Sequence, residues 1–250
     1  EFGNPFQLKL STPLHLQLKQ LRQPQLITQD WTVSGHVNGS LDQLNSELNI
    51  QGSHGLANTL TAAWNGNRLD AKMRLGPIKL HAKNALNSTF SAWPNKLKTQ
   101  QGELESQLNL YYQHPHLTGE FLGRFTHVSG SFDAHQFKDL NLTVNADWRL
   151  KHGDELTQHH TELSNTGLSF ALAHYAYEDM QVEQLSGGFT LEGKVDNQQL
   201  DIHLIQPATL ASKSSVFNSD WRSQQLSLSL DKLHIKGDYA NLALDSPLSG

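Results

Sequence analysis

Residues 139–150 read DLNLTVNADWRL, and every second residue of this stretch is apolar. In a helix, which turns by 100° per residue, the six apolar side chains would scatter around the axis. In a β-strand successive side chains point to opposite faces, so all six would lie on one face. The stretch therefore predicts a long strand with one apolar and one polar face. The apolar positions are Leu140, Leu142, Val144, Ala146, Trp148 and Leu150.

The same alternation occurs twice in the forty residues before this stretch. Residues 103–112 place Leu104, Leu108, Leu110 and Tyr112 opposite acidic and amide side chains. A break at His114-Pro115 follows, and residues 117–125 then resume the pattern with leucine, phenylalanine and glycine. Strand, turn and strand repeated in this way predict an antiparallel meander.

The rest of the chain shows the same period of two from Leu8 to Leu244, and no amphipathic helix of useful length. Asn65-Gly66 between alternating runs is a strong hairpin signal, because a type I′ turn needs positive φ at both central residues. Gly76-Pro77 predicts a further turn. The chain is therefore expected to be all-β, an extended, strongly curved antiparallel meander sheet with little or no helix.

A sheet with one apolar face must hide that face. Without helices to cover it, the sheet can pack on itself as a sandwich, close as a barrel, or curl into a trough that something else occupies. Leucine dominates the apolar positions, and a leucine-rich surface suits either an ordinary dry core or contact with acyl chains. Both interpretations remain open at this point.

Composition limits the function classes. The chain has 250 residues, no cysteine and a net charge of −5, and its 19 Lys and Arg residues are dispersed, so nucleic-acid binding is not expected. No run of about 18 apolar residues is present. The chain has no Met start, so we expect residues 1–250 to be a single segment excised from a longer protein, with residues 1–3 a cloning remnant.

Candidate catalytic and metal sites have simpler interpretations. His114 and His116 share a strand face and could form half a metal site, but no further ligand has recognisable spacing. The acidic pair Glu103/Glu105 lies on the polar side of a predicted strand, where no water-excluding pocket is implied. No serine elbow or phosphate-binding glycine loop is present. We expect no catalytic residue, no metal, no cofactor and no enzymatic activity.

Two phrases carry a resemblance to a known family. They are GELESQLNL at residues 102–110 and VSGSFDAHQFKDLNL at residues 128–142. With the long Leu-alternating strands around them, they resemble the AsmA-like, repeating β-groove proteins of Gram-negative envelopes, and most of all the YdbH branch. The resemblance implies a sheet bent into a U-shaped apolar groove that carries phospholipid acyl chains between inner and outer membranes. It also implies a periplasmic location, an inner-membrane anchor and an outer-membrane partner in the full-length protein.

The function expected from the sequence is thus a passive lipid-binding conduit. The alternatives are a β-sandwich binding module of the adhesin or lectin type and, less favoured, an envelope hydrolase on a β scaffold. The groove lining is expected to come from the apolar positions of the long strands. These are Leu10, Leu16, Leu48, Ile50, Leu108, Leu110, Phe121, Phe125, Leu140, Leu142, Val144, Trp148, Ile202, Leu204 and Leu228.

Overall fold

The computed structural model describes residues 13–23, 26–40, 42–52, 57–80, 96–152, 159–196, 199–217, 221–238 and 241–245. These residues form strands and their connections, with no helix among them. The all-β prediction is confirmed. Leu10, the first predicted lining residue, lies outside the described residues.

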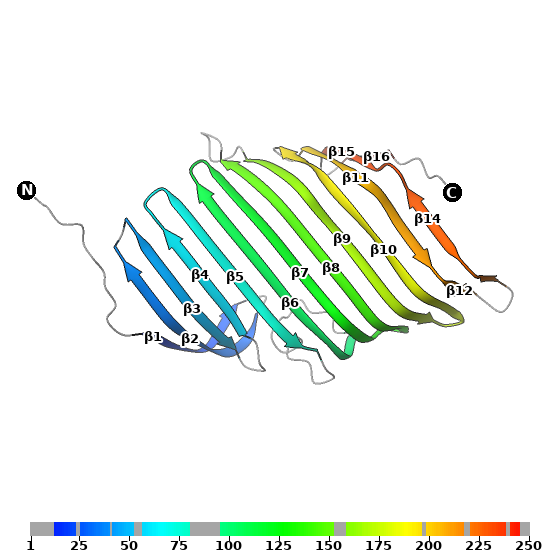
Figure 1. The fold of residues 1–250 in the computed structure, drawn as a ribbon, viewed down its shortest axis with the longest axis horizontal. Helices are drawn as coiled ribbons and strands as arrows, with labels where there is room; N and C mark the ends of the chain where they lie inside the picture. Colours follow the sequence, from blue (N-terminus) through cyan, green and yellow to red (C-terminus); the bar gives the residue numbers. More distant parts are fainter. Residues whose placement is uncertain are drawn as a thin grey trace, which may run out of the picture.

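The strands follow one another across a single antiparallel sheet in chain order (Figure 1). The N-terminal strands are β1 (Leu14–Gln23), β2 (Leu26–Gly39), β3 (Leu44–Gly52), β4 (Ala57–Trp64) and β5 (Arg68–Lys79). The long central strands are β6 (Leu97–Gln113), β7 (His116–Phe132), β8 (His135–His152), β9 (His159–Tyr177), β10 (Met180–Asp196) and β11 (Gln199–Ser212). The short C-terminal strands are β12 (Ser214–Val216), β13 (Arg222–Ser223), β14 (Leu226–Leu230), β15 (His234–Asp238) and β16 (Asn241–Asp245).

The sheet is open rather than closed into a barrel. Its main path runs from β1 through β11 to β15 and β16, which is thirteen strands. At the C-terminal side β11 pairs with β15 along residues 199–203 and with β14 along residues 208–212. Strands lie about 4.8 Å apart, so this path spans about 58 Å. The predicted meander is confirmed.

Two of the predicted turns are present and one is not. At Asn65-Gly66 the Asn65 N–H donates to the Arg68 carbonyl oxygen at 3.0 Å, which closes the β4–β5 hairpin. His114-Pro115 joins β6 to β7 as expected. The prediction of a turn at Gly76-Pro77 is wrong, because the chain does not reverse there and β5 continues to Lys79. Gly76 and Pro77 form a bulge, with a register shift against β6 between Leu75 and Ile78.

Similar irregularities lie side by side on four neighbouring strands. Positive φ angles occur at Gly76 in β5, Gly102 in β6, His127 in β7 and Asp139 in β8. Register shifts mark the β5–β6, β6–β7 and β7–β8 pairings in the same region. A bulge bends its strand and increases the local twist, so bulges in adjacent strands bend the whole sheet along one line.

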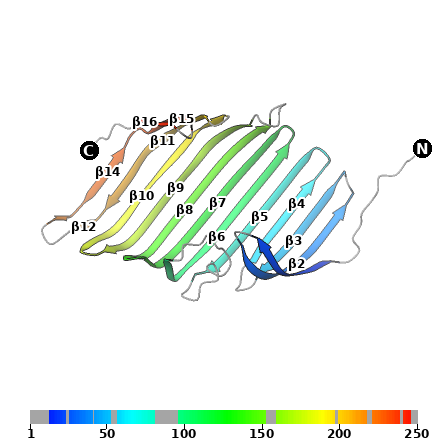
Figure 2. The same ribbon diagram turned by 180° about the vertical axis from the view of Figure 1, so that it is seen from behind.

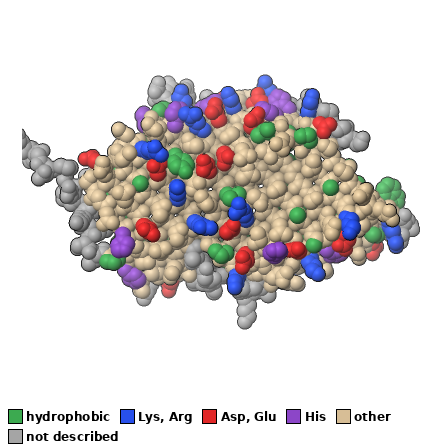
Figure 3. Space-filling view, viewed as in Figure 1, with side chains coloured by type: hydrophobic (Ala, Val, Ile, Leu, Met, Phe, Trp, Pro, Cys, Tyr) green, Lys and Arg blue, Asp and Glu red, His purple; other side chains and the backbone are tan. Residues whose placement is uncertain are grey.

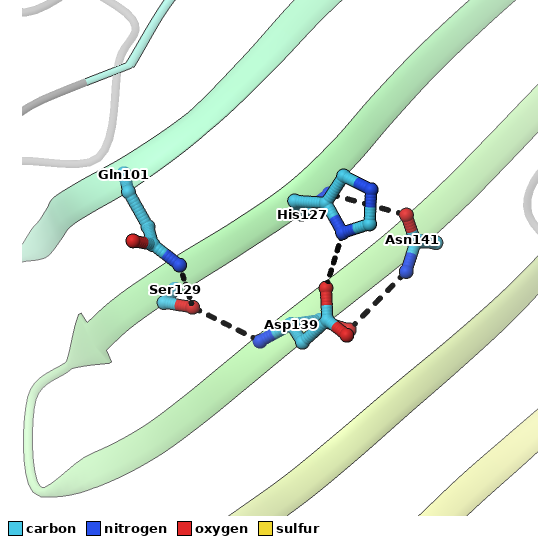
Figure 4. A network of polar contacts seen from close by, with 5 residues as sticks. All are labelled: Gln101, His127, Ser129, Asp139 and Asn141. Atoms are coloured by element: carbon cyan, nitrogen blue, oxygen red, sulfur yellow. Dashed lines mark hydrogen bonds and ion pairs between the residues drawn. The ribbon is translucent and has the colours of Figure 1, made fainter.

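Polar side chains on the outside of this line satisfy the backbone groups that the bulges release (Figure 4). The His127 N–H donates to Asn141 Oδ1 at 3.1 Å, and the Asp139 N–H donates to Ser129 Oγ at 3.0 Å. Gln101 Nε2 also donates to Ser129 Oγ, at 3.3 Å. His127 Nδ1 lies 2.6 Å from Asp139 Oδ1. These hydrogen bonds give partners to backbone groups that the bulges take out of the strand pairing, and they stabilise the bend.

The inside of the bend holds the best buried hydrophobic cluster of the described chain. Ile78, Leu80 and Val128 are 2%, 1% and 4% exposed. Trp31 of β2 packs against them although β3 and β4 separate it from β5 in the sheet. The end of the β1–β2 pair therefore folds back over the sheet, as Figure 2 shows. The expected strong curvature is present here.

Candidate functional site: the apolar face of the sheet

Cross-strand register assigns side chains to the two faces of the sheet, because directly opposite residues of an antiparallel pair point to the same side. One face carries most of the apolar residues, and we call it the apolar face. The fourteen predicted lining residues that the structure describes all lie on it, from Leu16 in β1 to Leu228 in β14. The period of two thus places these fourteen residues on one face, and their role as a groove lining stays a prediction.

Two cross-strand rows show how continuous the apolar face is. The first crosses β3 to β8 through Leu48, Leu60, Met73, Leu108, Phe121 and Ala146. The second crosses β7 to β11 and β14 through Phe125, Leu142, Phe170, Gly187, Leu210 and Leu228. Each row is apolar at every strand it crosses.

Most of this face is not buried. Only five hydrophobic residues of the described chain are buried, and they are Ile78, Leu80, Val128, Leu172 and Val182. Leu16, Met73 and Leu228, from three well-separated strands, are 45%, 39% and 47% exposed. A dry sandwich core would bury its inward side chains on both sheets. The described residues instead leave a broad apolar surface open on one side of a single sheet.

Aromatic rings lie flat over glycines on the apolar face. Trp148 is directly opposite Gly119, and a Cβ added to Gly119 would lie 2.0 Å from Trp148 Cζ2. Phe170 lies over Gly187 in the same way, with Cε1 3.0 Å from the added Cβ. A ring lying down against the backbone takes little height above the sheet. At these two positions the apolar face therefore projects less from the sheet than it would with an upright indole or phenyl ring.

The opposite face is polar, and Figure 3 shows charged side chains and histidines spread over it. Across five strands the directly opposite residues alternate in charge: Arg149 in β8, Glu162 in β9, Lys194 in β10, Asp201 in β11 and Lys236 in β15. Opposite charges at facing positions are favourable and like charges are not. This ladder therefore helps to fix the register of the long strands.

Histidines join the charged ladder. His160 contacts the Asp196 carboxylate through Nδ1 and Glu162 Oε1 through Nε2 at 3.3 Å. Hydrogen bonding to Asp196, followed by that to Glu162, raises the pKa of His160 above its ordinary value of 6.5. His234 Nε2 lies 2.7 Å from Asp201 Oδ1, and this hydrogen bond lowers the pKa of the Asp201 carboxyl. The His160–Asp196 and His234–Asp201 pairs cannot be predicted from local sequence, since their partners are 36 and 33 residues apart.

The candidate chemical sites do not assemble. Among the described residues no group of three His, Cys, Asp or Glu side chains is placed to hold a metal ion. Glu105 forms an ion pair with Arg124 at 3.2 Å on the polar face. His114 and His116 flank the β6–β7 turn, and His114 Nδ1 lies 3.5 Å from the Tyr112 hydroxyl. The apolar face is therefore the feature that invites a functional explanation.

In the part of the chain described above, no helix has the length and apolarity needed to cross a bilayer. Comparison of the chain with protein-family models, with curated proteins and with solved structures finds no match.

Proposed function

We propose that this chain binds phospholipid acyl chains on the apolar face and acts as a passive conduit for them. The observation that supports the proposal is a continuous apolar surface that crosses the strands of the sheet. Outside the region around Trp31, where the β1–β2 end folds back, no described element covers it. Contiguous exposed apolar patches much larger than a few hundred Å² mark interaction sites on soluble proteins. Here the patch crosses the whole sheet.

Acyl chains fit this surface in chemistry and in size. Burying a methylene group contributes about 0.8 kcal/mol, so a chain of about 16 carbons with half its surface covered gains about 6 kcal/mol. The face supplies apolar side chains at each strand, roughly every 4.8 Å, so a chain can move across strands without losing contact. The flat Trp148 and Phe170 rings keep that path low.

The conduit needs no chemical step. Its residues bind by dispersion and by exclusion of water, and the polar face keeps the sheet in contact with solvent. The resemblance to AsmA-like groove proteins of the YdbH branch supports the same function. It further suggests transport between inner and outer membranes in a Gram-negative periplasm, with an inner-membrane anchor and an outer-membrane partner in the longer protein.

The β-sandwich binding module finds less support. A sandwich needs two sheets packed face to face about 10 Å apart. The described residues form one sheet, and the only part that folds back is the β1–β2 end around Trp31. No observation on the polar face favours glycan binding over ordinary solvation.

The test is whether the purified 250-residue chain carries phospholipid. After gentle purification, lipid extracted from the protein is quantified by mass spectrometry. We expect phospholipid in the wild type and a clear loss in Leu108→Asp, because a carboxylate in the centre of the apolar face opposes acyl contact. Thr143→Asp, on the polar face between Arg124 and Ser169, is the matched control and should retain lipid. Wild-type protein without lipid, or equal occupancy in Leu108→Asp, contradicts the proposal.

A further inference from the structure

The apolar face ends in a row of mostly aromatic side chains along one edge of the sheet. This edge carries the β7–β8 and β9–β10 turns and the β12–β13 connection, at the lower side of Figure 1. We call the row the aromatic rim. Its members are Phe132, His135, Tyr177, Met180, Phe217 and Trp221.

Neighbouring members of the aromatic rim contact one another across the strands. Phe132 is directly opposite His135, and the His135 ring stacks on Tyr177 with centroids 4.2 Å apart. Tyr177 is opposite Met180. At the far end the Phe217 and Trp221 rings meet edge to face at 6.5 Å, and the Phe217 N–H donates to the Trp221 carbonyl oxygen. Gln181 is opposite Val216, so Met180 and Phe217 take the next positions along this edge and the two groups form one row.

The rim is open to solvent at both ends. Phe132 is 43% exposed, Phe217 is 40% exposed and Trp221 is 70% exposed. Trp221 is the most exposed large hydrophobic residue of the described chain. The opposite edge of the apolar face differs in exposure. Its last row also contains aromatic residues, but none of its large side chains is among the exposed hydrophobic residues of the described chain. This row runs through Trp64, Leu69, Tyr112, Leu117 and Leu150.

Polar atoms accompany the rings. His135 Nδ1 lies 2.6 Å from the Tyr175 hydroxyl, directly behind the rim. Rings with an apolar body and a polar tip are enriched where hydrocarbon meets water in a bilayer, at the level of the lipid headgroups. Buried aromatic clusters without polar groups would instead favour a dry protein core.

Charges of both signs lie near the rim, two basic and three acidic residues. Lys96 and Asp133 form an ion pair at 2.7 Å beside Phe132. Glu178 and Asp179 form the β9–β10 turn, and Arg222 follows Trp221 in β13. A surface that relies on anionic lipid carries clusters of Lys and Arg. A surface that carries both signs without a basic cluster complements zwitterionic headgroups, which also carry both signs.

We infer that the aromatic rim docks this edge of the sheet on a phospholipid bilayer surface, with Phe217 and Trp221 inserted at headgroup depth. The inference rests on the proposed function in one respect, that the apolar face joined to the rim is lined by lipid. Docking here would place this edge of the apolar face against the hydrocarbon boundary. Acyl chains would then pass between bilayer and face without crossing water.

The experiment measures binding of the 250-residue chain to phosphatidylcholine vesicles by co-sedimentation and by quenching of tryptophan fluorescence with lipids brominated near the headgroup. We expect wild-type protein to bind, to be quenched, and to bind equally at low and high salt. The double variant Phe217→Ala/Trp221→Ala should bind about tenfold more weakly. Trp221→Phe keeps an apolar ring and should retain most of the binding but lose most of the quenching.

Two controls separate the rim from the rest of the apolar face and from the proposed function. Leu117→Ala/Leu150→Ala removes apolar surface at the opposite edge and should leave vesicle binding unchanged. Lipid that co-purifies with the Phe217→Ala/Trp221→Ala variant should equal that of the wild type. Absence of vesicle binding, unchanged binding in that variant, or an equal loss in the Leu117/Leu150 variant overturns the inference. If one of these results is found while the purified protein still carries phospholipid, the docking inference fails and the proposed function stands. If the protein binds vesicles but carries no co-purified phospholipid, the proposed function fails and the docking inference stands.

Discussion

Leu142→Asp distinguishes an open apolar face from a covered one. Leu142 lies in the middle of β8, directly opposite Phe125 in β7 and Phe170 in β9, and is half-buried by these neighbours. The substitution removes two cross-strand contacts, each worth about 0.2–1 kcal/mol, and introduces a poor strand former at a cost of about 1 kcal/mol. Because no described element covers the site, the carboxylate can keep its water. We expect a loss of about 2 kcal/mol.

Val128→Asp supplies the matched contrast. Val128 is 4% exposed, inside the bend with Ile78 and Leu80. A carboxylate there is buried without a partner, which costs about 4 kcal/mol or more. For a chain of this length each kcal/mol lowers Tm by roughly 2–4 °C. Leu142→Asp should therefore lower Tm by about 4–8 °C, and Val128→Asp by at least twice as much or by complete unfolding.

The assay is thermal unfolding of both variants and the wild type followed by circular dichroism. Thr143→Asp on the polar face is the control and should leave Tm nearly unchanged. Asn141 is unsuitable as the control, because its Oδ1 accepts from the His127 N–H and its Nδ2 donates to the Asp139 carbonyl oxygen. Equal destabilisation by Leu142→Asp and Val128→Asp would refute the reasoning, since it would mean that the apolar face is covered.

Three further predictions concern the polar face and the floor of the apolar face. Hydrogen bonds to Asp196 and Glu162 raise the pKa of His160, so protonated His160 stabilises the folded state. This contribution to the free energy of unfolding is complete below pH 6.5 and is lost as the pH rises through the raised pKa. Between pH 6.5 and the raised pKa, Tm should therefore fall more in the wild type than in His160→Gln. Identical profiles of Tm against pH in the two proteins would exclude a contribution of protonated His160 to stability. Glu162→Lys places a positive charge opposite Arg149 and Lys194. Urea unfolding should show that the free energy of unfolding falls by about 1 kcal/mol, and that this loss is smaller at high salt. A loss that does not depend on salt contradicts a stabilising charge ladder. Gly119→Val should lower the free energy of unfolding by about 1–3 kcal/mol, because the added side chain collides with Trp148. In the same assay the double variant Gly119→Val/Trp148→Ala should recover part of this stability relative to Trp148→Ala alone, and no recovery contradicts the collision.

Most of the fold follows from one property of the sequence. Alternation between Asp139 and Leu150 is a local signal, and a strand expresses it whatever its neighbours are. Chain order then predicts the meander, because consecutive antiparallel strands joined by short turns pair with each other. The composition of the apolar face follows as well, since the period decides which side chains share a side.

The bulges and the aromatic rim cannot be predicted from the alternation of apolar and polar residues. Gly76-Pro77 has the composition of a turn, and whether it turns or bulges depends on the pairing of residues on either side with β6. The non-glycine residues with positive φ, such as His127 and Asp139, carry no local signature; their conformation depends on the adjacent strands and on Asn141 and Ser129. Contacts between distant residues decide these features.

The aromatic rim was equally hidden. Phe132 and Trp221 are separated by 89 positions and become members of one row only through the registers of the strands between them. Phe132 lies in the family-like phrase at residues 128–142, and no sequence motif includes Trp221. Neither the β7–β8 turn nor the β9–β10 turn is predicted from the sequence, so the edge that carries them is not predicted either.

The central claim is that acyl chains occupy one face of the sheet, and photo-crosslinking by face tests it most directly. A photoreactive amino acid is placed singly at positions 108, 142 and 204 on the apolar face and at 143, 149 and 203 on the polar face. The protein is irradiated with its co-purified lipid, and adducts are identified by mass spectrometry. The account predicts phospholipid adducts at Leu108, Leu142 and Leu204 and none above background at Thr143, Arg149 and His203. Equal labelling of the two faces, or no adduct on the apolar face of lipid-loaded protein, would contradict it.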